Sequence, residues 1–177
     1  ADVLALVYAI VVNKGDVGLA GNTFGKLKLA EMTDGEKQNV CNWMRDRWQL
    51  PGTRDLALRA CRAFGNVNAG KMAALRYLHW RCQHVRGGED FKEGLETAGE
   101  MQKVPDYAKE SFLLGGNLLQ WSGKYEEAIQ AYQQADSPPQ TLFWTAECLA
   151  KLGRLEPAVS QLREVENFFK DRAPEAA

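Results

Sequence analysis

The chain is poor in the residues from which most catalytic and metal sites are built. Its 177 residues include only two histidines and four cysteines. His79 and His84 lie five residues apart, which is not the i, i+4 spacing of a helical zinc site. The four cysteines form no CxxC pair: Cys41, Cys61, Cys82 and Cys148. We therefore expect no catalytic residues, no metal and no cofactor, and we expect reduced cysteines buried inside helices.

Long hydrophobic runs are also missing. The longest uncharged apolar run extends from Val3 to Val12, whereas a membrane-spanning helix needs about 20 such residues. This segment predicts a core helix rather than a membrane span. It lacks the basic leading segment of a signal peptide. The sequence leaves the compartment open: the cytoplasm is favoured, and the periplasm is the alternative if Ala1 is a processed end.

Alternating strand patterns are absent, and helical periodicity takes their place along almost the whole chain. Apolar residues recur three and four positions apart in five segments: 3–13, 36–49, 72–86, 107–121 and 139–152. Each segment is followed by a short polar, Gly- or Pro-containing break and then by another helical pattern. This alternation predicts an all-α fold of helix pairs.

The breaks carry the chemistry of helix ends. Residues 33–36 (Thr-Asp-Gly-Glu) and 137–140 (Ser-Pro-Pro-Gln) both have the hydroxyl-x-x-Glu/Gln form of a capping box. In the second of these, Pro138 is expected at the first helical position, where its missing N–H has no cost. Three glycines fall between predicted helices, where a positive φ is expected: Gly15, Gly123 and Gly153.

The helix pairs repeat. The segment from Gly123 through Ala128 to Tyr132 aligns with the segment from Gly153 through Ala158 to Leu162: each has a glycine turn, a large residue two later, a small residue five later and an apolar residue four beyond that. The same frame recurs upstream. The small anchors of the five copies, spaced by 40, 34, 34 and 30 residues, are Ala20, Ala60, Gly94, Ala128 and Ala158.

This pattern resembles the tetratricopeptide repeat family, whose unit is a helix pair of about 34 residues with small residues where the two helices cross. The matching crossing positions in the preceding helices are Tyr8, Trp48, Cys82, Gly116 and Ala146. The resemblance is strongest from 107 to 166, and Tyr8 and Trp48 are bulkier than the pattern requires. It implies an α-α superhelix of about five antiparallel helix pairs, approximately 1–32, 33–70, 71–104, 105–137 and 138–173.

Charge is distributed unevenly along the chain. Residues 1–87 carry 13 Lys and Arg against 7 Asp and Glu, whereas residues 88–177 carry 9 against 16. Much of the positive charge is arginine between Arg45 and Arg86. Such a cluster attracts acidic partners.

The resemblance implies that the first helix of each pair lines a concave groove that holds extended peptides or partner helices. Its expected partner-binding residues are Asn42, Arg45, Gln49, Arg76, His79, Gln83, Arg86, Asn117, Gln120 and Trp121, followed by Phe143 and Glu147. Guanidinium and amide groups suit carboxylates and peptide backbone. The sequence thus predicts a non-catalytic protein-protein interaction module or scaffold that binds a peptide or helix, acidic in the favoured case.

Three alternatives stay open at this point. The first is a secretion-type chaperone of the tetratricopeptide class, suggested by residues 146–149 (Ala-Glu-Cys-Leu). The second is a nucleic-acid-binding array that uses the Arg45–Arg86 cluster, against which the acidic C-terminal half argues. The third is self-association, through the N-terminal apolar helix or through oppositely charged ends.

Overall fold

The computed structural model describes residues 19, 22–23, 26, 32–33, 35–36, 68–84 and 88–170. The chain divides into two compact units, residues 1–78 and 79–177, and the boundary falls inside a helix. The predicted helix 3–13 and nearly all of 36–49 lie outside the described residues. So do the anchors and crossing positions of the first two repeats: Ala20, Ala60, Tyr8 and Trp48.

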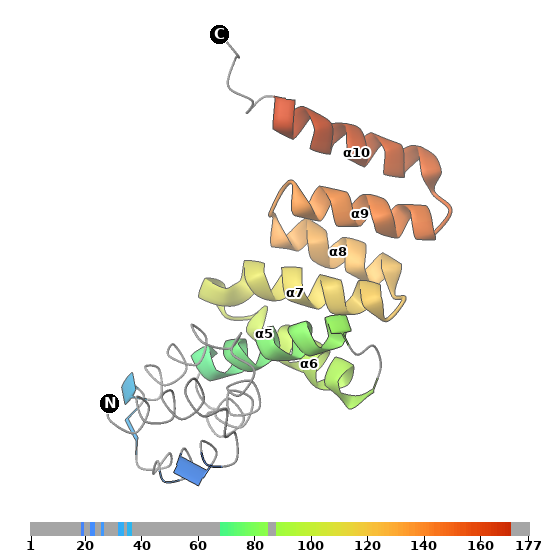
Figure 1. Cartoon of the computed structure of the whole chain (residues 1–177). Coiled ribbons are helices and arrows are strands. Elements are labelled where there is room, and N and C mark those ends of the chain that lie inside the picture. The colour runs from blue at the N-terminus through green and yellow to red at the C-terminus, as the bar shows by residue number, and fades with distance from the viewer. Residues whose placement is uncertain are drawn as a thin grey trace. The chain divides into compact units, whose positions relative to one another are not determined.

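Helices dominate the described residues, and no strand occurs among them (Figure 1). In chain order they are α5 (Asn68–His84), α6 (Glu89–Met101), the short 3-10 helix η3 (Pro105–Tyr107), α7 (Ala108–Trp121), α8 (Tyr125–Ala135), α9 (Gln140–Lys151) and α10 (Leu155–Lys170). The predicted all-α class is confirmed. The predicted segments 107–121 and 139–152 match α7 and α9 to within one residue at each end.

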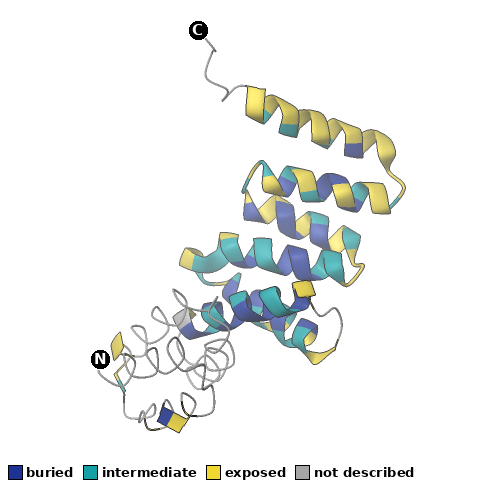
Figure 2. Ribbon diagram, in the orientation of Figure 1, coloured by how far each residue is buried: buried dark blue, intermediate teal, exposed yellow. Residues whose placement is uncertain are grey.

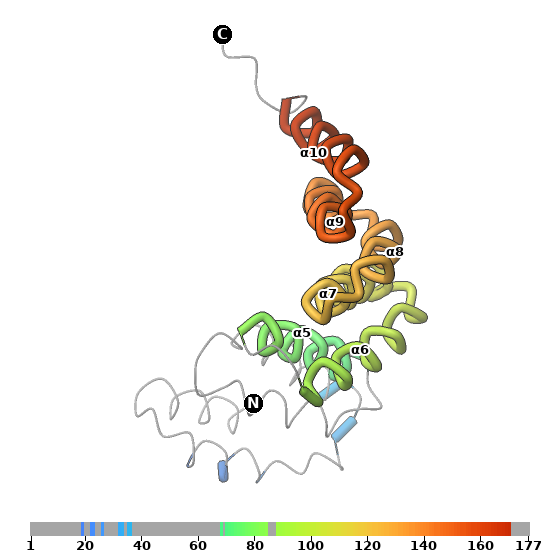
Figure 3. The backbone as a smooth tube through the Cα atoms, turned by 90° about the vertical axis from the view of Figure 1, so that its right-hand side faces the viewer, coloured from blue at the N-terminus to red at the C-terminus, as the bar shows by residue number. Residues whose placement is uncertain are grey.

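Within the second unit each helix packs on the next one in the chain. Contacts join α6 to α7, α7 to α8, α8 to α9 and α9 to α10. The two views of the molecule show α7, α8, α9 and α10 following one another as successive layers (Figures 1 and 3). Because three-residue turns connect α7 to α8 and α9 to α10, these helices form two antiparallel hairpins.

Glycine turns close both hairpins, as the sequence predicts. Gly123 has φ 83° and Gly153 has φ 76°, a backbone region in which a side chain is strained. In the turn after α7, the N–H of Lys124 donates a hydrogen bond to the carbonyl of Leu119 at 2.9 Å. The turn after α9 repeats this bond from Arg154 to the carbonyl of Leu149, also at 2.9 Å. Both turns are Schellman caps, which satisfy the last carbonyls of a helix.

The small residues of the repeat lie inside the molecule, as expected (Figure 2). The described anchors and crossing positions are all buried: Gly94, Ala128, Ala158, Cys82, Gly116 and Ala146. The crossing of α7 over α8 is close. A Cβ placed on Gly116 would lie 2.6 Å from Cε1 of Tyr132. Glycine is therefore required here for the two helices to approach to this distance.

The core of the second unit forms around this crossing. Ala128, Tyr132 and Cys148 make one buried cluster, and five partly buried side chains pack on it: Leu113, Leu119, Tyr125, Ile129 and Trp144. Cys82 and Cys148 are free, buried thiols, as predicted, and Cys41 and Cys61 lie outside the described residues. In the first unit, Tyr77 and Leu78 of α5 form a buried pair.

One predicted capping box is confirmed and the other is wrong. The backbone N–H and hydroxyl of Thr33 each donate to Glu36 Oε2 at 2.8 Å, and the Glu36 N–H donates back to the Thr33 hydroxyl at 3.3 Å. In residues 137–140, α9 begins only at Gln140, with Pro139 as its cap and no side-chain capping bond. A residue that precedes proline disfavours the helical conformation, so Pro138 cannot be the first residue of the helix.

Candidate functional site

The predicted groove residues divide between described and undescribed parts of the chain. Asn42, Arg45, Gln49 and Arg86 lie outside the described residues. Arg76 is half-buried on the part of α5 that belongs to the first unit. The second unit holds the others: His79 and Gln83 on α5, Asn117, Gln120 and Trp121 on α7, and Phe143 and Glu147 on α9.

A chain of hydrogen bonds brings several of these residues together. The amide nitrogen of Asn117 lies 3.0 Å from Nε2 of His79. The Tyr132 hydroxyl lies 2.8 Å from Oδ1 of Asn117 and 2.6 Å from Oε1 of Gln120, so its single proton is shared between two carbonyl oxygens. Gln120 Nε2 in turn donates to Glu147 Oε2 at 3.0 Å. We call these five residues the polar network; they come from α5, α7, α8 and α9.

Burial fixes the protonation states within the polar network. It lowers the pKa of His79 to about 4, so the imidazole is neutral at pH 7. Its Nε2 therefore carries a free lone pair and accepts from the Asn117 amide. Burial also raises the pKa of Tyr132, reinforced by the nearby Cys148 and Glu147. The tyrosine consequently remains a hydroxyl donor at physiological pH.

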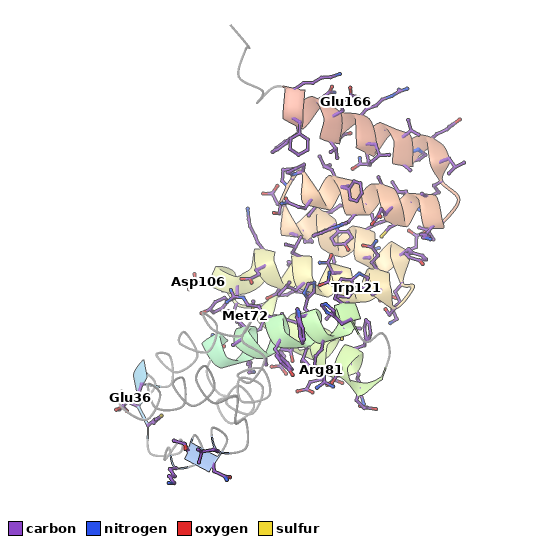
Figure 4. The ribbon with its side chains drawn as sticks, viewed as in Figure 1. Glu36, Met72, Arg81, Asp106, Trp121 and Glu166 are labelled. Carbon is purple, nitrogen blue, oxygen red and sulfur yellow. The ribbon has the colours of Figure 1, made fainter. Side chains whose placement is uncertain are left out.

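Trp121 adds an aromatic contact to the histidine end of the network. Its ring centroid lies 4.8 Å from that of His79, with the planes tilted by 37°. Figure 4 labels Trp121 among the side chains. Trp121 is half-buried, so part of its ring faces outward. This tilted ring contact with His79 helps to hold the indole at the end of α7.

The seven second-unit residues differ in their access to solvent. Asn117 is only 6% exposed, so its amide acts inside the molecule and positions its neighbours. Gln83 and Glu147 are exposed, Gln120 is partly exposed, and Phe143 is 45% exposed. The solvent-accessible groups among them are thus amides, a carboxylate and aromatic rings. We call Gln83, Gln120, Trp121, Phe143 and Glu147 the contact row.

Tyr132 is the member of the network that sequence reasoning missed. Its place in the repeat marks it as a large packing residue, and it does pack there, 1% exposed with its ring centroid 5.6 Å from that of Trp144. The additional signal was its hydroxyl, since a buried tyrosine hydroxyl needs a polar partner. Its two partners in the structure are Asn117, next to the glycine at the helix crossing, and Gln120.

The arginine cluster is partly neutralised where it is described. Arg81 Nη2 lies 2.8 Å from Asp90 Oδ2, and Asp90 is 20% exposed. This ion pair joins α5 to α6 across residues 85–87. Arg81 is therefore engaged within the protein and is not a free cation for phosphate binding.

The cysteines and histidines of the described residues show no catalytic or metal-binding arrangement. Burial raises the pKa of the Cys82 thiol to about 11 and that of Cys148 to about 12, so neither is an activated nucleophile. His84 Nδ1 lies 2.9 Å from the Trp80 carbonyl. Within residues 68–84 and 88–170, and at the few described positions before them, His, Cys, Asp and Glu form no group of three suited to a metal ion.

A separate apolar surface lies on the last helix. Four large side chains of α10 are exposed: Leu155 by 65%, Val159 by 48%, Leu162 by 44% and Phe169 by 59%. They recur at helical spacing on one side of α10, whose only buried residue is Ala158. In α8 the corresponding positions are Tyr125, Ile129 and Tyr132, which pack into the core cluster.

No protein-family model and no curated protein sequence matches the chain. Among the described helices none combines the length and the apolar composition of a membrane span.

Proposed function

We propose that the chain is a non-catalytic, tetratricopeptide-like protein-binding module whose partner lies along the contact row of α5, α7 and α9. The proposal is supported by the repeat frame of the sequence and by the burial of its described small residues. It is also supported by the antiparallel hairpins α7–α8 and α9–α10.

The observation that carries the proposal is the polar network behind the contact row. It holds Gln120 and Glu147 in one arrangement before any partner arrives. Because a partner does not have to order side chains that are already fixed, less of the binding energy is lost. A packing role alone does not account for the buried Asn117 amide, which connects α5, α7 and α8.

The chemistry of the contact row suits a peptide or helix with both polar and apolar side chains. Gln83 and Gln120 can pair with backbone groups, and Trp121 and Phe143 offer aromatic surface. Glu147 favours a donor or a cation opposite it. The proposed preference for an acidic partner rests instead on Arg45, Arg76 and Arg86, which precede α6 in the chain.

Selection from a random peptide library tests the contact row. Peptides of 12 residues would be displayed on phage and selected on the wild-type protein, and their affinities would be measured by fluorescence anisotropy. We expect Trp121→Ala together with Gln83→Ala to weaken binding at least tenfold. The matched control is Gln130→Ala, a change at an exposed residue of α8 outside the row. Equal affinity for all three proteins would refute the proposed site.

A second function, self-association, is favoured by the exposed apolar residues of α10. Contiguous apolar surface of this kind often marks an interaction site. Sedimentation velocity over a range of concentrations tests it, with Leu162→Glu as the variant. Association through α10 predicts that the variant stays monomeric where the wild type associates. Association through charged ends predicts instead that the wild type and the variant both associate, and that high salt dissociates both.

A further inference from the structure

A groove of about 480 Å³ lies between α8 and α10, with α9 as its floor. It is distinct from the contact row, none of whose residues lines it. Its floor includes Thr141 and Thr145, one helical turn apart, with Leu142 beside them. Gln133 of α8 and Gln161 of α10 stand at its sides. None of its ten lining residues carries a charge.

The two threonine hydroxyls are buried without a partner. Thr141 is 6% exposed and Thr145 is 8% exposed. Neither hydroxyl has a hydrogen-bond partner within the described part of the chain. Burying a hydroxyl without a hydrogen bond costs free energy, and such groups are rare in native structures. Two of them in one groove leave hydrogen-bonding capacity that a ligand group can take up.

Other helical threonines of the same chain behave differently. The Thr97 hydroxyl donates to the carbonyl of Glu93 at 2.7 Å, and the Thr23 hydroxyl donates to the carbonyl of Leu19 at 2.8 Å. Both bonds reach back four residues, which is the ordinary way for a helical threonine to satisfy its hydroxyl. Thr141 and Thr145 do not make this bond, so their hydroxyls remain available to the groove.

The spacing of the two hydroxyls matches an extended peptide. Residues four apart in an α-helix are separated by about 6 Å along its axis. In an extended strand, alternate residues repeat every 6.6 to 6.8 Å, roughly the same distance. An extended segment lying along α9 can therefore place successive backbone groups of one edge opposite both hydroxyls.

We propose that this groove binds an extended peptide segment whose side chains are uncharged, and that the Thr141 and Thr145 hydroxyls pair with its backbone. The side-chain amides of Gln133 and Gln161 offer further donors and acceptors to the same backbone. Leu142, together with Ile129 and Leu149 along the groove, receives an aliphatic side chain of the peptide. A charged side chain is disfavoured because no lining residue can pair with it.

The test uses a displayed library of 12-residue peptides that lack Asp, Glu, Lys and Arg. Peptides enriched on the full chain would be measured against the double variant Thr141→Val/Thr145→Val, which keeps the side-chain shape and removes both hydroxyls. We expect at least a tenfold loss of affinity and a melting temperature equal to or above that of the wild type, because no internal bond is lost.

Thr97→Val is the matched control. It removes a hydroxyl that is bonded within its own helix, so we expect a lower melting temperature and unchanged peptide affinity. Trp121→Ala, on the contact row, should also leave this binding unchanged. The proposal is overturned if the double variant binds the enriched peptides as tightly as the wild type, if it melts below Thr97→Val, or if the library yields no enriched peptide.

Discussion

Gly116 of α7 packs against the ring of Tyr132 of α8 so closely that a Cβ on the glycine would lie 2.6 Å from Cε1 and 2.7 Å from Cδ1 of the tyrosine. The tyrosine ring cannot move aside easily. It is 1% exposed, and its hydroxyl is held by Asn117 and Gln120. We expect Gly116→Ala to lower the free energy of unfolding by about 1 to 3 kcal/mol, the usual range for overpacking. Urea denaturation measures this difference.

Gly99→Ala is the control for that change. Gly99 also lies in a helix, α6, but a Cβ there would meet nothing within 4 Å. Alanine restricts the unfolded chain and favours the helix, so we expect a gain of about 0.5 to 1 kcal/mol. If both variants changed stability in the same direction and by similar amounts, the result would contradict the close contact between Gly116 of α7 and Tyr132 of α8.

Removing the Tyr132 hydroxyl tests the polar network. Tyr132→Phe keeps the ring in the core but leaves the buried carbonyl oxygen of Asn117 without its donor. We expect a loss of about 1 to 3 kcal/mol in the free energy of unfolding, the cost of an unsatisfied buried polar group. Tyr125→Phe, on the same helix but outside the network, should change stability by less than about 0.5 kcal/mol. Equal losses in the two variants would argue against the network.

The glycine turns after α7 and α9 and the crossing positions of the second unit could be predicted because they depend on local chemistry. A glycine at 123 or 153 is the natural residue for a left-handed turn, and both positions have positive φ. A small residue at 116 or 128 follows from the repeat frame, and both are buried. These signals lie within one or two helical turns of the feature that they predict.

The candidate site was less predictable because its bonds connect residues that are far apart in the sequence. His79 and Asn117 are 38 positions apart, and Gln120 and Glu147 are 27 apart. Helical periodicity placed them on the first helices of their pairs, but it did not show that Asn117 is buried. That outcome depends on where the Tyr132 hydroxyl lies, which only the packing of α7 on α8 determines.

His79 makes stability depend on pH. Burial lowers its pKa from 6.5 to about 4, so between these values the unfolded state binds more protons than the folded state. Stability from this group is complete above pH 6.5 and is lost as the pH falls toward 4. We expect a loss of about 2 kcal/mol between pH 7.5 and pH 5. Urea denaturation at several pH values measures it.

His79→Gln removes this titration and should flatten the curve over the same range, whatever it does to stability at pH 7.5. The control is His84→Gln. His84 is exposed and lies outside the polar network, so that variant should keep the slope of the wild type. A wild-type slope in His79→Gln would show that other groups cause the pH dependence.

The buried thiols should resist alkylation while the protein is folded. Burial raises the pKa of Cys82 to about 11 and that of Cys148 to about 12, from a usual 9.0. At pH 8 the reactive thiolate is therefore roughly 100-fold scarcer for Cys82 than for an ordinary thiol, and scarcer still for Cys148. Both sulfurs are also closed to solvent, since each residue is 0% exposed.

Iodoacetamide labelling at pH 8, mapped by mass spectrometry of tryptic peptides, measures the labelling of Cys82 and Cys148 individually, because Cys41 and Cys61 fall in other peptides. We expect Cys82 and Cys148 to remain unlabelled in native buffer and to react fully in 8 M urea. Gly116→Ala should speed the labelling of Cys148, because Cys148 packs in the same cluster as Tyr132, and a less stable core opens more often. Native labelling at the rate of an exposed thiol would contradict the packing of α9 on α8.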